Sequence, residues 1–172
     1  MSERKIGIVM NGVTGRMGKN QHLINSIAAI RRDDGVLLTD GSRLMPDPIL
    51  IGRDEDRLKA VAAGAGIAKY STELGAALAD PNNSIYFDAV LTTARAANIK
   101  QAIAAGKHIY TEKPTAEGFD EALSLYHAAR DKGVKHGVVA DKLIASTSLR
   151  PVVREKVCPN DSRWLPEVAP VV

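Results

Sequence analysis

The side chains best suited to chemistry are Glu112 and Lys113, which stand directly before Pro114. A proline disfavours helix for the residue before it and makes a cis peptide bond accessible, so a stiff backbone aims the lysine. A lysine held in this way can donate a proton to a carbonyl oxygen or hold a hydroxyl group. A surface Glu–Lys pair before a turn proline would have the same spacing, so the elements around these residues must decide their role.

A second chemical feature is the glycine-rich stretch of residues 5–18, KIGIVMNGVTGRMG. An apolar run breaks into Gly12, Gly15 and Gly18, and helix-like spacing follows. In a strand–turn–helix unit these glycines allow the bend, the approach of a pyrophosphate and close packing of the helix on the strand. Ordinary tight turns also use such glycines. If the turn binds a cofactor, the contacts are expected from Gly12, Val13, Thr14, Gly15, Arg16 and Met17.

The composition bounds the class of protein. The chain has 172 residues, of which 45% are hydrophobic, and this suits one domain of ordinary size. The net charge of +3 is small, the basic residues are dispersed and only 4% of residues are aromatic, so nucleic-acid binding is not expected. No apolar run approaches the roughly 20 residues of a membrane span, and the start MSERK does not resemble a signal peptide. We therefore expect a cytoplasmic protein without a membrane partner.

Cysteine and histidine usage gives no support for a metal site. Cys158 is the single cysteine, which excludes an internal disulfide and a cysteine-based metal cluster. The histidines show no ligand-like spacing, so we interpret all of them as structural or surface residues: His22, His108, His127 and His136.

Short apolar runs alternate with amphipathic segments along most of the chain. The expected strands are residues 6–9, 49–51, 67–70, 85–91, 108–112 and 134–140, and residues 39–48 are expected to form a loop. This alternation predicts right-handed βαβ crossovers and a doubly wound parallel sheet, a Rossmann-type α/β domain over residues 1–142. Ligands of such sheets bind at the carboxyl ends of the strands, where the glycine turn, Arg53, Thr92 and Lys113 fall.

The end of the second expected strand bears on which dinucleotide binds. A carboxylate there accepts the ribose hydroxyls of NAD, whereas an arginine suits the additional phosphate of NADP. This strand ends in Gly52 and Arg53, so we expect NADP, with NAD as the alternative. Asp54 comes next and is expected to cap the following helix; a ribose contact is the alternative role. No ribose contact is expected from the aspartates of the preceding loop, Asp33, Asp34 and Asp40.

Three segments in this order, KIGIVMNGVTGRMG, ILIGRDEDRLKAVA and AIAAGKHIYTEKP, resemble the cofactor domain of the glucose-fructose oxidoreductase and inositol dehydrogenase (Gfo/Idh/MocA) family. The likeness covers roughly residues 5–143 and is most specific in AGKHIYTEKP. It implies NAD(P)-dependent oxidoreduction of a sugar, cyclitol or related compound, with Lys113 as the catalytic residue that contacts cofactor and substrate. It also implies that the cofactor is bound by Gly12, Gly15, Arg53, Thr92, Glu112 and Lys113. Where the family often reads Thr-Pro-Asn, this chain has Thr92-Thr93-Ala94-Arg95.

Residues 143–172 differ in character from the rest. They contain no glycine, four of the eight prolines and the only tryptophan, without sustained periodicity. The resembled enzymes continue into a second, largely sheet domain that holds most of the substrate. We therefore expect an atypical tail and a truncated product with little or no turnover; the alternative is a genuine short protein whose tail packs on the sheet.

Two other functions stay open at this point. One is a non-catalytic NADP-binding module, such as a redox sensor or partner subunit. The other is a reductase of the dihydrodipicolinate type, whose glycine turn can also read GRMG. An oligomer is possible, and nothing in the sequence indicates one.

Overall fold

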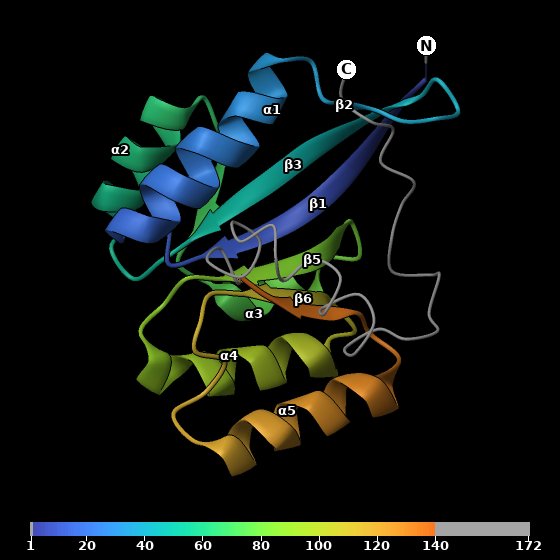
Figure 1. The fold of residues 1–172 in the computed structure, drawn as a ribbon. Coiled ribbons are helices and arrows are strands. Elements are labelled where there is room, and N and C mark those ends of the chain that lie inside the picture. Colours follow the sequence, from blue (N-terminus) through green and yellow to red (C-terminus); the bar gives the residue numbers. More distant parts are fainter. Residues whose placement is uncertain (1, 140–172) are drawn as a thin grey trace, which may run out of the picture. The chain divides into compact units, whose positions relative to one another are not determined.

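The computed structural model describes residues 2–139, which form a mostly parallel sheet with helices on both faces (Figure 1). The strands are β1 (Glu3–Asn11), β2 (Val36–Leu37), β3 (Arg43–Ile51), β4 (Lys69–Ser71), β5 (Asn83–Asp88), β6 (His108–Thr111) and β7 (His136–Val138). The helices are η1 (Met17–Ala28), which is wound as a π-helix, α1 (Ala29–Arg32), α2 (Glu55–Ala65), α3 (Leu74–Ala79), α4 (Thr92–Ala104) and α5 (Phe119–Lys132). The expected tail, residues 143–172, lies outside the described residues.

The strand order confirms the predicted fold. From one edge the parallel strands run β4, β3, β1, β5, β6 and β7, while β2 pairs antiparallel with the start of β3. This is the order of a doubly wound dinucleotide-binding sheet, in which the chain reverses its direction of growth at β1. The helices η1 and α2 cover one face of the sheet, and α3, α4 and α5 cover the other (Figure 1).

The central strands β1, β3 and β5 contribute to two hydrophobic cores because successive side chains point to opposite faces. Val9 and Tyr86 pack on the side of α4 and α5, whereas their neighbours Met10 and Phe87 pack with Leu23 on the side of η1 and α2. All five of these side chains are at least 96% buried. The sheet is therefore buried on both faces, as the unbroken apolar runs predicted.

The expected loop over residues 39–48 is wrong, because residues 43–48 belong to β3. Pro46 and Pro48 suggested a loop. Gly12 N donates to Ile51 O, so the main-chain groups of Ile51 point toward β1. Along a strand this direction alternates, so the main-chain nitrogens of Pro46 and Pro48 point to the other side, away from β1. On that side β2 pairs only with the start of β3 and β4 only with its end. The two prolines lie in the gap between them, where no N–H donor is required.

The predicted end of the fourth strand is also wrong. β5 ends at Asp88 instead of Leu91, and Leu91 is the N-cap of α4. Thr92 and Thr93 thus begin a helix. None of the helices within residues 2–139 has both the length and the apolar character needed to cross a membrane.

Candidate functional site

A cavity of about 580 Å³ opens at the carboxyl ends of β1, β3 and β5. Its walls come from the glycine turn after β1, the β3–α2 junction, and the loop and first turns of α4 after β5. Ligands of doubly wound sheets bind in this position, where the strand order changes direction. Four of the predicted binding residues line it: Gly12, Thr14, Gly15 and Arg53.

The glycine turn forms a tight cradle at one wall of this cavity. Gly12 has φ +87°, and a Cβ there would lie 2.5 Å from the carbonyl carbon of Ala89. A Cβ on Gly18 would lie 2.4 Å from Gly12 O. At Gly15 the nearest atom to a Cβ would be Gly12 O, at 3.4 Å, so the approach to the main chain is open. The turn therefore has the space that a dinucleotide phosphate needs, and a side chain at Gly15 would fill it.

The remaining predicted residues of the turn contribute differently. Val13 is completely buried in the core beneath the turn, so it can offer a ligand only main-chain groups. Arg16 and Met17 are exposed at the entry to η1, and neither is among the residues that line the cavity.

Two arginines lie at the β3–α2 side of the cavity. Arg53 follows β3 after Gly52, and Arg57 lies in the first turn of α2, with Nη2 donating to Thr14 O at 3.5 Å. Asp54 caps α2, because its carboxylate accepts a hydrogen bond of 3.0 Å from Arg57 N. The structure thus supports the capping role of Asp54 and adds Arg57, which the sequence analysis missed. Its signal was its place in the first turn of the helix that follows the second predicted strand, four residues after Arg53.

The three aspartates of the preceding loop lie away from the cavity, at the start of β3. Asp40 accepts hydrogen bonds from Ser42 Oγ and Ser42 N, at 2.6 and 2.8 Å, and these bonds hold the pKa of Asp40 below its usual value. Asp34 lies 3.4 Å from Arg43 Nε. Both carboxylates are therefore engaged in the local structure.

Lys113 lies just beyond the carboxyl end of β6, at the same edge of the sheet as the glycine turn. Glu112 N donates to Asp88 O at 2.8 Å, which extends the pairing of β6 with β5 by one residue. Lys113 N donates to Glu112 Oε2 at 3.2 Å, and the Lys113–Pro114 peptide bond is cis. The Lys113 side chain is exposed. Three more predicted residues, Thr92, Glu112 and Lys113, do not line the cavity. Thr93, which was not predicted as a contact, does line it.

His22 contacts Glu112, a connection that the sequence analysis missed. His22 Nε2 lies 2.5 Å from Glu112 Oε1, and the imidazole packs on Phe87 with ring centroids 4.5 Å apart. Glu112 is only 6% exposed. His22 belongs to η1, so this pair joins the helix after the glycine turn to the residue before Lys113. Ninety residues separate the two side chains, and no local pattern could have indicated the contact.

A buried polar network lies beneath the cavity. Asp88 is completely buried; its carboxylate accepts hydrogen bonds from Arg95 Nε at 3.0 Å and from Tyr86 OH at 2.5 Å. Burial, with the Asp88 carboxylate beside it, raises the pKa of Tyr86, so the phenol stays protonated and donates. Asn11 Nδ2 donates to Tyr86 OH at 3.1 Å, and Asn11 also lines the cavity. The network therefore fixes the floor of the site.

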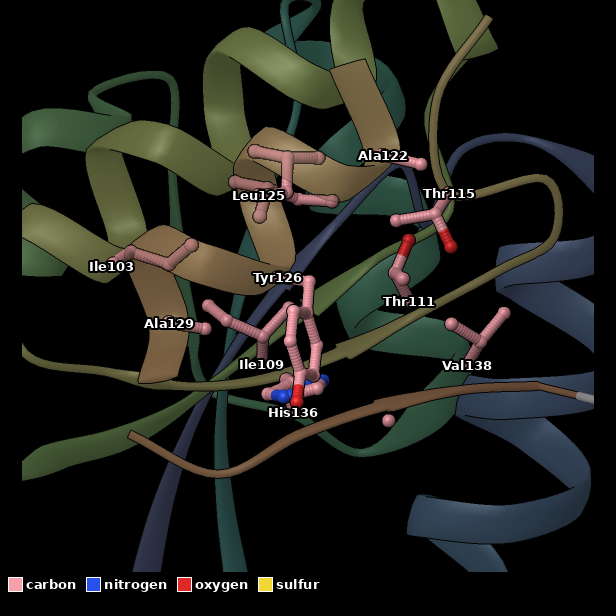
Figure 2. Close-up of a pocket in the computed structure, with 12 residues that line it drawn as sticks. Ile103, Ile109, Thr111, Thr115, Ala122, Leu125, Tyr126, Ala129, His136 and Val138 are labelled. Carbon is pink, nitrogen blue, oxygen red and sulfur yellow. The ribbon is translucent and has the colours of Figure 1, made fainter. Parts of the chain in front are cut away.

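A second hollow, of about 200 Å³, lies between α5 and the strands β6 and β7 (Figure 2). Figure 2 shows Leu125 and Tyr126 of α5 facing Ile109 and His136. None of the described residues that line it is a lysine or an arginine. It is thus less suited than the larger cavity to a ligand with several phosphates.

Comparison with known proteins identifies the family. Residues 6–140 match the Gfo/Idh/MocA family, described as an oxidoreductase family with an NAD-binding Rossmann fold. The chain belongs to this family. This confirms the resemblance and the predicted dinucleotide-binding Rossmann fold. A curated relative, the D-xylose dehydrogenase of Paenarthrobacter nicotinovorans, is 47% identical over 138 residues, which are 80% of this chain and 36% of the relative.

Solved structures of the same architecture bind either dinucleotide. Levoglucosan dehydrogenase in complex with NADH and levoglucosan matches 78% of this chain and 35% of its own, with TM-score 0.66 and 23% identity. Biliverdin reductase from Synechocystis sp. PCC 6803, in complex with biliverdin and NADP+, matches 89% of this chain and 42% of its own, with TM-score 0.61 and 23% identity. At these identities the likeness supports the fold alone. The chain spans about a third of the length of the D-xylose and levoglucosan dehydrogenases.

Proposed function

We propose that this chain binds NADP and provides the cofactor site and Lys113 for the oxidation or reduction of a sugar or polyol. The observation that carries the proposal is the cavity itself, with a glycine cradle at one wall and two arginines at another. Because the chain covers 36% of the related D-xylose dehydrogenase, the proposal for these residues is limited to cofactor binding and to the chemistry of Lys113.

The charges around the cavity favour NADP over NAD. Arg53 and Arg57 both line it, and among the described residues none that lines it is an aspartate or glutamate. NAD is selected by a carboxylate that accepts the ribose hydroxyls, whereas guanidinium groups pair with the additional phosphate of NADP. The main chain of Gly12 and Gly15 would hold the pyrophosphate. Arg53 and Arg57 would hold the phosphate on the adenosine ribose.

Lys113 is the proposed catalytic residue. The bound dinucleotide supplies or accepts the hydride. The Lys113 ammonium would donate a proton from Nζ to the carbonyl oxygen of the substrate, and in the other direction the neutral amine would take the proton from the hydroxyl. Glu112, held by His22, accepts the hydrogen bond from Lys113 N and so orients the main chain there. The related enzyme named for D-xylose supports a sugar as the substrate class.

Two assays on the purified chain test this function. Isothermal titration with NADPH and NADH is expected to show tighter binding of NADPH, by about tenfold or more, since one charge-assisted contact is worth that much. Turnover is then measured across a panel of aldoses and polyols, with the K113M variant as the matched control. Binding without turnover would restrict the proposal for this chain to cofactor binding. Failure to bind either dinucleotide would contradict the proposal.

A further inference from the structure

Arg95 connects the cofactor cavity to the segment that carries Lys113. It lies in the first turn of α4 and is only 3% exposed. Its guanidinium donates to three acceptors: Asp88 Oδ1 at 3.0 Å, Val90 O at 2.6 Å, and Pro114 O. Val90 lines the cavity, and Pro114 directly follows Lys113. The guanidinium of Arg95 thus bonds both to Val90 in the wall of the cavity and to the carbonyl of the residue after Lys113.

We propose that Arg95 is a positioning residue that holds Lys113 at the cofactor site by tying the carbonyl of Pro114 to the loop after β5. The inference rests on the proposed function, because the role of Lys113 comes from it. Proline has no N–H group, so the carbonyl is the one main-chain polar group by which Pro114 can be anchored. Arg95 Nη1 donates a hydrogen bond to that carbonyl.

The anchor acts on a short segment whose ends are already fixed. Upstream, Glu112 N donates to Asp88 O. Downstream, Ala116 is buried in the core with α4 and α5, and Thr115 faces the smaller hollow (Figure 2). Between these attachments Lys113 and Pro114 are exposed. Together with the bond from Lys113 N to Glu112 Oε2, the Arg95 contact therefore limits how far the backbone at Lys113 can move.

Arginine suits this task because its fork presents five N–H donors in fixed directions, which can reach three separate acceptors. Asp88 provides the countercharge within the buried site. A lysine at this position keeps the charge beside Asp88, but a single ammonium cannot serve the two carbonyls and the carboxylate in the same geometry. R95K should therefore keep the fold and loosen the tether.

Lys107 provides a matched control for a purely structural role. It is a second buried cation, 6% exposed, and its Nζ donates to Asp80 O and Asn83 O at 2.9 and 2.6 Å. Asn83 begins β5, so these bonds lie at the edge of the sheet opposite the cavity. K107M removes a comparable buried cation and its carbonyl bonds, and leaves the Lys113 segment untouched.

The test is hydrogen exchange, followed by mass spectrometry, on the full 172-residue chain without cofactor. R95K is expected to speed exchange of the Glu112 and Lys113 amides by about tenfold, as expected for the loss of a charge-assisted hydrogen bond; they are followed in a peptide that begins several residues before Glu112. K107M should leave the exchange rate of that peptide unchanged, even if K107M lowers the melting temperature as much as R95K does. If R95K does not fold, the double variant D88N/R95Q is used in its place, because it leaves no unpaired buried charge.

A second readout follows Lys113 itself. Saturating NADPH is expected to protect the Lys113 amine from acetylation in the original chain and in K107M, and to protect it several-fold less in R95K. Equal exchange in R95K and the original chain, or equal acceleration in K107M, would overturn the positioning role. If the original chain binds no NADPH, the proposed function fails, while the exchange comparison still decides whether Arg95 tethers the segment.

Discussion

Exchanging single glycines of the turn for alanine should separate binding from folding. A Cβ on Gly15 would have one neighbour within 4 Å, Gly12 O at 3.4 Å, so G15A should fold with little change. Its methyl group would occupy the approach to the main chain that we assign to the pyrophosphate. Loss of charge-assisted hydrogen bonds worth about 1.5–3 kcal/mol corresponds to roughly a tenfold to hundredfold weaker Kd for NADPH.

G18A should show the opposite result. Its Cβ would lie 2.4 Å from Gly12 O, a main-chain atom that can move only with the turn. Overpacking of this kind costs about 1–3 kcal/mol, against a gain of up to about 1 kcal/mol from replacing glycine within a helix. G18A is thus expected to lower the free energy of unfolding.

Urea unfolding and isothermal titration with NADPH measure the two quantities. G64A is the control, because a Cβ there has open space in α2; it should gain about 1 kcal/mol of stability with unchanged affinity. If G15A bound NADPH as tightly as the original chain, the phosphate would not lie on Gly15 and the assignment of the turn would be refuted.

Three further predictions follow from the site. R53A and R57A should each weaken NADPH binding by about tenfold while changing NADH binding little, as measured by titration; equal losses for both dinucleotides would contradict an NADP-specific role. H22Q retains an N–H donor for Glu112 and should preserve the protection of the Lys113 amine by NADPH, whereas H22L should weaken it; equal protection would show that the pair is dispensable. Asp40 has a lowered pKa, so its bond to Ser42 stabilises the fold above pH of about 4, and this stabilisation is lost as pH falls through that pKa. S42A should therefore lower Tm at pH 7 and lower it less at pH 3. The same lowering of Tm at both pH values would exclude this linkage.

Elements that depend on local residue patterns could be predicted from the sequence. The apolar run before Gly12 and the helical spacing after Gly18 predict a strand, a turn and a helix within one short segment, and the structure has them. Residues 43–48 were misassigned because prolines usually interrupt strands, and only the strand order shows that Pro46 and Pro48 lie in a gap between two partners.

The site could be predicted only in part for a similar reason. Arg53 and Gly15 follow from their positions in the motif, and both line the cavity. The contacts of His22 with Glu112 and of Arg95 with Pro114 join residues 90 and 19 positions apart, so they exist only once the sheet has formed. Long-range polar contacts of this kind leave no periodicity in a single sequence.

A crystal structure of the chain with NADP+ tests the central claim most directly. We predict the pyrophosphate on the main chain of Gly12 and Gly15, the phosphate of the adenosine ribose between Arg53 and Arg57, and the nicotinamide at the edge of the sheet that carries Lys113. A dinucleotide bound elsewhere, for example in the hollow between α5 and β7, or one whose adenosine phosphate contacts neither arginine, would contradict the account.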